Sequence, residues 1–273
     1  MELIFSLRGH SAGITSISIE DNHLLSGDSE GTLIYWDLEI RRPISSWKAH
    51  NSSILKTAIQ NNFYSQGRDD LIRVWNKNYE LLGQFPAYSL SFCGFAINNE
   101  KMVYPLEYSL VVLKLDGMEI EREIQLDKKY GNCLSLAIQD GEVHGGFEDG
   151  SVVSFGKEQK SIKVMNEPLL TLDFEKYLYC AGAESFIAKI VGDEIEKIQL
   201  ANPGISQITC YNGVIFGACW DSSIVKIGEE IEYYNEHREA IRCVSVGKVN
   251  LKKASTIVCI GSDDARISVW KLE

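Results

Sequence analysis

The chain carries the stretch YSQGRDDLIRVW at residues 64–75, and two close copies of it occur elsewhere. The copies are LLSGDSEGTLIYW at residues 24–36 and VCIGSDDARISVW at residues 258–270. Each of the three has a short β-rich run, a polar turn containing Asp, and an alternating run that ends in Trp. This pattern predicts a β-hairpin with a tight turn.

Weaker copies of the hairpin fill the middle of the chain. They occupy residues 102–113, 143–155, 177–191 and 214–227, and the first is the most degenerate because Pro105 stands where its turn should begin. The seven hairpins end at residues 36, 75, about 113, 155, about 191, about 227 and 270. Units of this length, each rich in strands, match the period of four-stranded propeller blades.

Additional strand-like segments complete the units. Inner strands fit residues 14–19, 133–138 and 241–246, and more polar outer strands fit residues 43–47 and 195–200. Residues 229–242 can also be read as a helix, but the repeat favours a strand at 231–234 followed by a loop. Residues 2–7 read as an outermost strand, which we expect to pair into the last blade and remove its open edge. We therefore predict an all-β fold, a single seven-bladed propeller over residues 1–273.

Composition and charge narrow the range of possible functions. The 273 residues are 45% hydrophobic and 24% charged, which is typical of a globular protein. A net charge of −11 argues against sequence-independent nucleic-acid binding and against docking on anionic membranes. The seven cysteines include no CxxC pair, so we interpret them as buried thiols in a reducing compartment. We expect protein partners, with no direct contact to nucleic acid or membrane.

The repeat resembles the WD40 family. Gly9-His10 precedes the first inner strand and Trp36-Asp37 follows the third strand, as in that family. The resemblance implies a hydrogen-bonded network of His, Ser, Asp and Trp that ties the loop, turn and strands of one blade together. The residues with this structural role are His10, Trp36, His50, Ser65, Asp69, Trp75, His237 and Trp270. The first unit departs from the pattern because Glu30 stands where the turn Asp is usual.

The first eighty residues resemble a narrower group, the ASTRA-associated WD-repeat proteins. The segments RPISSWKAH at 42–50 and QGRDD at 66–70 carry this resemblance. Animal relatives of the group are called guanine-nucleotide-binding β-subunit-like proteins. The resemblance implies a non-catalytic scaffold that works with the Tel2–Tti1–Tti2 cochaperone in maturation of phosphatidylinositol-3-kinase-related kinases and in chromatin-linked complexes. It further implies helical-repeat partners, a monomer within a hetero-complex, and a location in nucleus and cytoplasm.

No residue pattern indicates catalysis, a cofactor or a metal site. The histidines and cysteines lack metal-ligand spacing, and paired acids recur at the same turn position, which favours turn chemistry. The Gly-rich run at 145–150 lacks the Lys-Ser/Thr and the helix that a phosphate loop requires.

Candidate protein-binding residues are cations and one aromatic. Arg68 lies in the turn between the second and third strands of the second unit, on the face that also carries His50. Arg8 borders the same face. Both can also be ordinary exposed residues. Arg41 and Arg42 lie in the loop after Trp36-Asp37, on the opposite face. Trp47 lies on an outer strand, where it either packs against the neighbouring blade or contacts a partner. The candidate set is Arg8, Arg41, Arg42, Trp47 and Arg68.

Three other functions fit the sequence less well. Substrate receptors of cullin ubiquitin ligases usually carry Arg two positions after Trp-Asp, where this chain has Leu38-Glu39, and they need an adaptor-binding domain. A heterotrimeric G-protein β subunit needs an N-terminal helix, whereas the first expected strand begins at residue 2 or 3. An enzyme built on a propeller needs a catalytic set, and none is recognisable.

Overall fold

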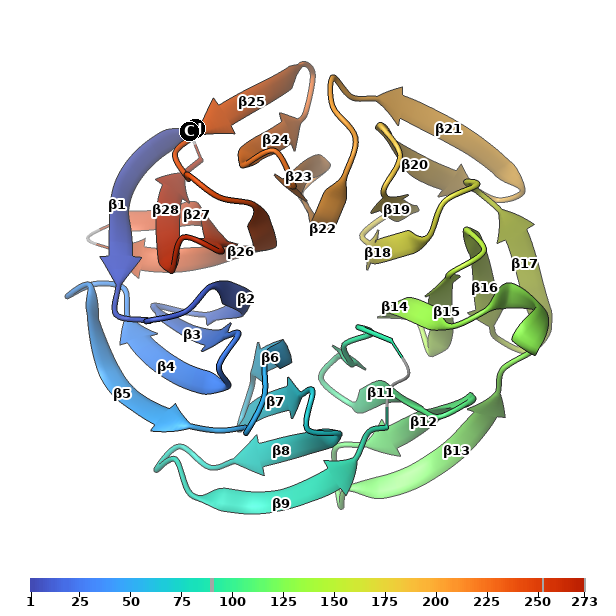
Figure 1. Cartoon of the computed structure of the whole chain (residues 1–273), viewed down its shortest axis with the longest axis horizontal. Coiled ribbons are helices and arrows are strands. Elements are labelled where there is room, and N and C mark those ends of the chain that lie inside the picture. The colour runs from blue at the N-terminus through green and yellow to red at the C-terminus, as the bar shows by residue number, and fades with distance from the viewer. Residues whose placement is uncertain (89–90, 252, 273) are drawn as a thin grey trace. The chain divides into compact units, whose positions relative to one another are not determined.

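The strands pair into seven sheets of four strands each in the computed structural model, which describes residues 1–88, 91–251 and 253–272 (Figure 1). The fold is all-β and is that of a seven-bladed β-propeller, which confirms the prediction from the repeat. Blades are numbered 1 to 7 here in chain order. Residue contacts divide the chain into two compact units, residues 1–86 with 214–273 and residues 87–213.

The first unit contains blades 1, 2 and 7 and most of blade 6. Its strands are β2 (Ile14–Glu20), β3 (His23–Asp28), β4 (Thr32–Asp37) and β5 (Arg42–Lys48) in blade 1; β6 (Ile54–Ile59), β7 (Phe63–Gly67), β8 (Leu71–Trp75) and β9 (Leu81–Pro86) in blade 2; β23 (Val214–Cys219), β24 (Ser223–Ile227) and β25 (Ile231–Asn235) in blade 6; and β26 (Ile241–Leu251), β27 (Lys253–Ser262), β28 (Arg266–Lys271) and β1 (Glu2–Arg8) in blade 7.

The second unit contains blades 3, 4 and 5 and the inner strand of blade 6. Its elements are β10 (Ala96–Ile97), β11 (Lys101–Leu106), β12 (Ser109–Lys114) and β13 (Glu119–Gln125) in blade 3; a 3-10 turn, η1 (Lys128–Tyr130); β14 (Cys133–Gln139), β15 (Glu142–Phe147), β16 (Ser151–Phe155) and β17 (Gln159–Lys163) in blade 4; β18 (Leu169–Phe174), β19 (Leu178–Gly182), β20 (Phe186–Val191) and β21 (Glu194–Gln199) in blade 5; and β22 (Ile205–Tyr211) in blade 6.

The N-terminal strand completes blade 7, as the sequence predicts. β1 pairs with β28 in antiparallel register, with Glu2 opposite Lys271 and Arg8 opposite Arg266. The order of this sheet is β1-β28-β27-β26, so the two ends of the chain share one blade. The outer edge of β28 is thereby paired, which protects it from other chains.

Blade 3 differs from the sequence-based expectation at Pro105. This residue lies inside β11 opposite Leu110, and the turn falls later, at Glu107 and Tyr108. The inner strand β10 contains only Ala96 and Ile97, which is why the repeat is hard to see here. The preference for a strand over a helix after residue 229 is confirmed by β25.

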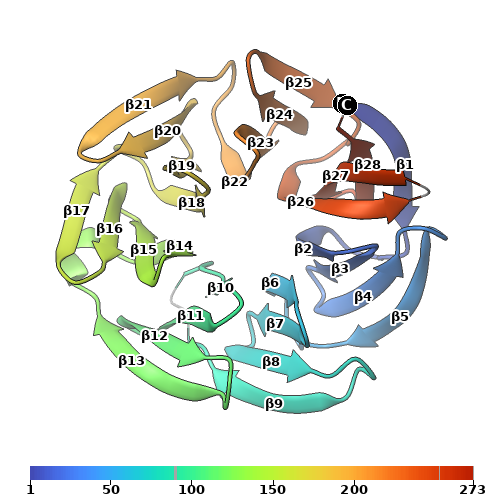
Figure 2. The ribbon, with the colours of Figure 1, turned by 180° about the vertical axis from the view of Figure 1, so that it is seen from behind.

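The hairpin of β26 and β27 is longer than the repeat predicts. β26 has 11 residues, whereas the other inner strands of the first unit, β2 and β6, have seven and six. The hairpin extends outward to the level of β1 (Figures 1 and 2). It passes β2 at Gly247, where a Cβ atom would come within 2.8 Å of Cγ2 of Ile19, so glycine permits this approach.

Asn22, in the turn between β2 and β3, holds the far part of the long hairpin. The Asn250 N–H donates to Asn22 Oδ1 at 2.6 Å, and Asn22 Nδ2 donates to the Asn250 carbonyl at 3.3 Å. One side-chain amide thus replaces the hydrogen bonds of a neighbouring strand. Val249 and Ile257 are buried beside it.

Apolar side chains from adjoining blades form the cores within each unit. One cluster joins blades 7 and 1 around Ile14, Trp36 and Ile257, and another joins blades 1 and 2 around Ile54, Phe63 and Trp75. All seven cysteines are free thiols; six are buried and Cys210 is half-buried. Burial raises the pKa of Cys180 to about 12 and that of Cys219 to about 11, which keeps both thiols protonated at neutral pH. The described residues include no helix that is long and apolar enough to cross a membrane.

Candidate functional site: protein-interaction surfaces

Blade 2 contains a continuous hydrogen-bonded chain from strand to turn. Trp75 Nε1 donates to Ser65 Oγ at 3.0 Å, and Ser65 Oγ lies 2.8 Å from His50 Nε2. His50 Nδ1 lies 2.7 Å from Asp69 Oδ1. In a neutral His50 the Ser65 hydroxyl can donate to Nε2 while Nδ1–H donates to Asp69. The chain fixes the loop that contains His50 against the turn that contains Asp69.

Arg73 strengthens this network from the neighbouring strand. Its guanidinium donates to Asp69 Oδ2 at 2.9 Å and to the Ala49 carbonyl at 2.7 Å. The His50 side chain is fully buried, and those of Arg73 and Asp69 are each 14% exposed. Charge-assisted hydrogen bonds of this kind are stronger than neutral ones.

Blade 1 builds the same network with a different acid. Trp36 Nε1 donates to Ser26 Oγ at 2.8 Å, and His10 Nε2 lies 2.7 Å from that oxygen. His10 Nδ1 lies 2.8 Å from Asp28 Oδ2, whereas Glu30 is exposed. Asp28 therefore replaces the turn Asp that the first unit lacks at Glu30, although the repeat pattern does not point to Asp28.

The position of Asp28 in blade 2 is occupied by Gly67, and both lie eight residues before the Trp of their blade. A Cβ atom at Gly67 would contact the His50 ring and would lie 2.6 Å from Asp69 Oδ1. In blade 2 the carboxylate therefore comes from Asp69, two positions after Gly67. The two solutions exclude each other because the same space holds either acid.

Blade 7 differs from blades 1 and 2 in the strand that supplies the serine of the network. His237 Nε2 lies 2.8 Å from Ser268 Oγ, and Trp270 Nε1 donates to the same oxygen at 2.8 Å. His237 Nδ1 lies 3.1 Å from Asp264. Ser268 is on β28 opposite Ile260. In blade 1 the hydroxyl is on the other strand, since Ser26 of β3 lies opposite Ile34 of β4. Serine and isoleucine have thus exchanged strands between blade 1 and blade 7. Because they are cross-strand partners in both blades, the hydroxyl lies in the same place.

The three networks order one face of the first unit. Each fixes a loop between blades to the turn between the second and third strands of a blade. Arg68 lies in such a turn, where its N–H donates to the Ser53 carbonyl at 2.9 Å, and its side chain is exposed. Arg8 is exposed at the end of β1, just before the loop of His10. Rigid loops of this kind present side chains for binding at low entropic cost.

Arg41 and Arg42 lie at the opposite end of the strands, Arg41 in the turn between β4 and β5 and Arg42 at the start of β5. Both are exposed, and the Arg41 guanidinium lies over the Phe5 ring at 4.5 Å from its centroid. Arg41 has φ of 59°, a left-handed conformation that side chains other than glycine seldom adopt. The turn is held by Asp37, whose Oδ1 accepts the N–H groups of Glu39 and Ile40 at 2.8 and 3.0 Å.

Trp47 lies apart from both arginine pairs. Its ring packs on blade 2, with centroid distances of 6.0 Å to Phe63, 6.0 Å to Trp75 and 5.1 Å to Tyr79. The side chain is half-buried, and its Nε1 is buried with no hydrogen-bond partner among the described residues. The structure thus distributes the five candidates over three places: Arg8 and Arg68, Arg41 and Arg42, and Trp47.

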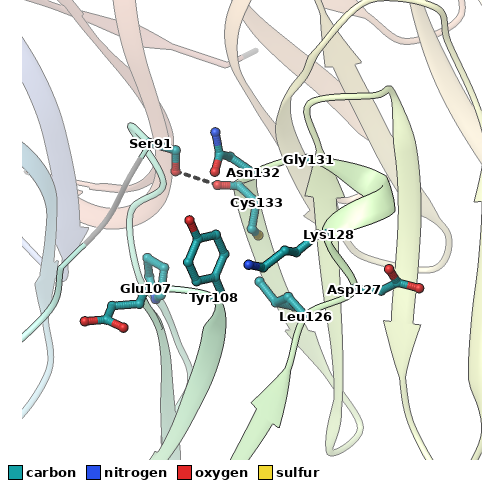
Figure 3. A pocket seen from close by; sticks show the side chains of 10 residues that line it. Ser91, Glu107, Tyr108, Leu126, Asp127, Lys128, Gly131, Asn132 and Cys133 are labelled. Atoms are coloured by element: carbon teal, nitrogen blue, oxygen red, sulfur yellow. Dashed lines mark hydrogen bonds between the residues drawn. The ribbon is translucent and has the colours of Figure 1, made fainter.

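A small cavity in the second unit was not expected from the sequence (Figure 3). Its volume is about 20 Å³, enough for about one water molecule and too small for a substrate. Ser91 Oγ donates to the Cys133 carbonyl at 2.5 Å, and Lys128 Nζ lies 4.3 Å from the centroid of the Tyr108 ring. Elsewhere too, no group of three His, Cys, Asp or Glu among the described residues is placed to hold a metal ion.

Burial and hydrogen bonds shift the pKa values of the network residues. Burial alone would raise the pKa values of Asp28, Asp69 and Asp264, but interactions with their histidines and with backbone N–H groups, and for Asp69 also with Arg73, outweigh it and lower all three pKa values. Burial lowers the pKa of His50, although Asp69 opposes this effect. Burial likewise lowers the pKa of His144, whose Nδ1 lies 2.7 Å from Ser154 Oγ.

These shifts predict a stability that decreases in acid. Because His50 and His144 have lowered pKa values when folded, the unfolded chain binds protons first as pH falls below about 6.5. The free energy of unfolding should then decrease by up to about 1.4 kcal/mol per pH unit for each histidine. The three aspartates add a second decrease below about pH 4, where the unfolded chain is protonated before the folded one. Denaturant titrations at a series of pH values measure both decreases.

The matched control for the histidine effect is His144→Asn, which removes one titrating group and leaves His50. Its slope of unfolding free energy against pH between about 7 and about 5 should be shallower than that of the unmodified chain. An unfolding free energy that stays constant over this range in the unmodified chain would contradict the prediction.

Seven four-stranded blades define a seven-bladed β-propeller, and three of them hold a His, Ser, Asp and Trp network that resembles that of WD40 repeats. The WD domain, G-beta repeat family matches residues 1–37, which cover His10, Ser26, Asp28 and Trp36. The chain also resembles curated proteins named ASTRA-associated protein 1.

Three of these relatives illustrate the extent of the match. The relative from Candida tropicalis is 30% identical over 176 residues, 55% of this chain and 49% of that protein. The one from Candida albicans (strain WO-1) is 32% identical over 128 residues, 45% of this chain and 33% of that protein. The chain thus spans about half of the first relative and a third of the second in these matches. The relative from Schizosaccharomyces japonicus is 24% identical over 363 aligned positions, 98% of each chain.

The alignment with the Schizosaccharomyces japonicus relative is longer than the 273 residues of this chain, so that relative carries insertions. The fold and these relatives together support a role in protein–protein interaction within a complex and point to a non-catalytic scaffold family.

Proposed function

We propose that the chain is a scaffold subunit of an ASTRA-type assembly. In this role it works with the Tel2–Tti1–Tti2 cochaperone in the maturation of phosphatidylinositol-3-kinase-related kinases and of chromatin-linked complexes. The observation that carries the proposal is the match to a protein named ASTRA-associated protein 1 over 98% of both chains. The segments at 42–50 and 66–70 support it because they contain features beyond the general repeat.

The partners are helical-repeat cochaperone subunits, bound by the propeller itself in the nucleus and the cytoplasm. Arg68 and Arg8 are the contact residues on the face that the histidine networks order. Arg is enriched among the residues that dominate binding energy at protein interfaces, and the loops that carry these two are held in place before binding. The net charge of −11 is consistent with protein partners.

Affinity purification of the tagged full chain, followed by mass spectrometry, tests the proposal. Cochaperone subunits or a kinase of this class should be recovered, and recovery should fall in the double variant Arg8→Glu and Arg68→Glu. Lys160→Glu, an exposed charge reversal on β17, serves as the control and should keep normal recovery. Absence of every such protein would refute the proposal, and recovery of a cullin-ligase adaptor would favour a substrate receptor instead.

A further inference from the structure

An apolar groove opens beside β1 at the end of the strands that carries Arg41. It has a volume of about 430 Å³, which lies in the range of roughly 300–1,000 Å³ found for ligand pockets. Its apolar lining comes from three elements: β1, the loop between β4 and β5, and the long hairpin. These residues are Ile4, Phe5, Leu38, Leu251 and Ile257. We refer to this feature as the β1 groove.

The long hairpin forms one wall of the β1 groove. Leu251 and Ile257 both belong to it, and Ile257 is fully buried. The hairpin is secured by Asn22 on its other side, as described above, so this wall is fixed. The extra length of β26 and β27 therefore creates a surface that an ordinary blade lacks.

Cations also line the groove, and one of them, Lys271, is the cross-strand neighbour of Ile257. Arg41 and Lys271 line the groove together with one carboxylate, Glu39, and Arg42 is exposed next to Arg41. Within the described part of the chain, Arg41, Arg42 and Lys271 form no ion pair. The groove is thus locally basic in a chain with a net charge of −11. Such an arrangement is complementary to a ligand that is both apolar and acidic.

Arg41 lies in the turn between β4 and β5, and its side chain is directed at the groove by its contact with Phe5. Its φ of 59° is a conformation suited to glycine, and its guanidinium is held over Phe5, one of the apolar lining residues. Ile40 beside it is 63% exposed, which extends the apolar surface beyond the groove itself.

We propose that the β1 groove binds an extended acidic peptide segment of a partner protein. One large apolar side chain of the peptide fills the groove, and Asp or Glu residues within the next few positions pair with Arg41 and Arg42. A peptide fits better than a small metabolite because Ile40 and Arg42 lie outside the groove and offer contacts along a segment. The inference rests on the proposed function only in taking the ligand to be a protein.

Selection of random peptides displayed on phage against the purified full chain provides the probe. Enriched peptides should contain one large apolar residue with two or more acids nearby. Synthesised with a fluorophore, they should bind in fluorescence polarisation, and binding should weaken by roughly tenfold when NaCl is raised from about 50 to about 500 mM.

Two variants separate loss of binding from loss of folding. Arg41→Gly removes the guanidinium but suits the left-handed turn, so it should fold at least as stably and bind the peptides roughly tenfold more weakly. Leu251→Asp should weaken binding through the apolar wall. Lys160→Glu is the control and should bind normally. Peptides without acids, no enrichment, equal binding by Arg41→Gly, or a dimer formed through this groove in sedimentation would each overturn the proposal.

The result of the peptide experiment does not depend on the proposed ASTRA-type role. The peptide experiment contains no cochaperone, so the groove can be established even if the affinity purification recovers none. Equally, recovery of the cochaperone with failed peptide selection would refute only the groove.

Discussion

Replacing Asp28 with Ala is expected to lower the free energy of unfolding by about 3 kcal/mol, since breaking a buried charged pair is strongly destabilising. Asp28 is 1% exposed, and its carboxylate receives His10 Nδ1–H and the N–H groups of Glu30 and Thr32. Alanine leaves all three donors without this acceptor. Chemical denaturation monitored by Trp fluorescence, with a fit for the unfolding free energy, measures the loss.

The matched control is Glu30→Ala, two residues away on the same turn. Glu30 holds the place that Asp69 holds in blade 2, but its side chain is exposed and takes no part in the His10 network. The expected change is within about 0.5 kcal/mol. Asp28→Asn should fall between the two, because Oδ1 still accepts the backbone N–H groups while the charge is lost. If Glu30→Ala proved as costly as Asp28→Ala, blade 1 would use the acid that the repeat alignment suggests.

The acid of blade 1, for which the sequence predicts no residue, shows what a repeat pattern can and cannot predict. Spacing from the Trp that ends each clear repeat locates the strands, since a hairpin needs a fixed number of residues on each side of its turn. It does not locate a hydrogen-bond partner, because Asp28 and Asp69 reach a histidine from different positions. Only the absence of a side chain at Gly67 hints that the two places compete for the same space.

The repeat pattern does not identify the serine of the blade 7 network, for a related reason. Ser268 and Ile260 are cross-strand partners, and recognition of their exchange requires the register of the ladder. Register follows from turn geometry, so it becomes visible only in the structure.

The long hairpin is a different case, because the length of the last unit indicates it in the sequence. The last unit is the longest of the seven. Residues 247–251 extend the expected inner strand, and they include Gly247, which allows the hairpin to pass β2. A length excess in one repeat indicates an inserted feature on the common frame. Its direction and its contacts with Asn22 depend on tertiary packing.

Replacing Trp47 with Ala is expected to lower the free energy of unfolding by about 3 kcal/mol. The indole packs between blades 1 and 2, in contact distance of Phe63, Trp75 and Tyr79. Its removal deletes apolar contacts and leaves a gap that the aromatic cluster cannot close. Ile44→Ala on the same strand is the control, since Ile44 is 46% exposed and its loss should cost no more than about 0.5 kcal/mol.

Trp47→Phe separates packing from partner contact. Phenylalanine keeps an aromatic ring in the cluster and removes an N–H that is buried without a partner among the described residues, so the stability should change by less than about 1 kcal/mol. If Trp47 serves packing alone, this variant should also recover protein partners at the normal level in affinity purification. A stable Trp47→Phe variant with lost recovery would instead identify the indole as a contact residue, because only a partner could then distinguish the two rings.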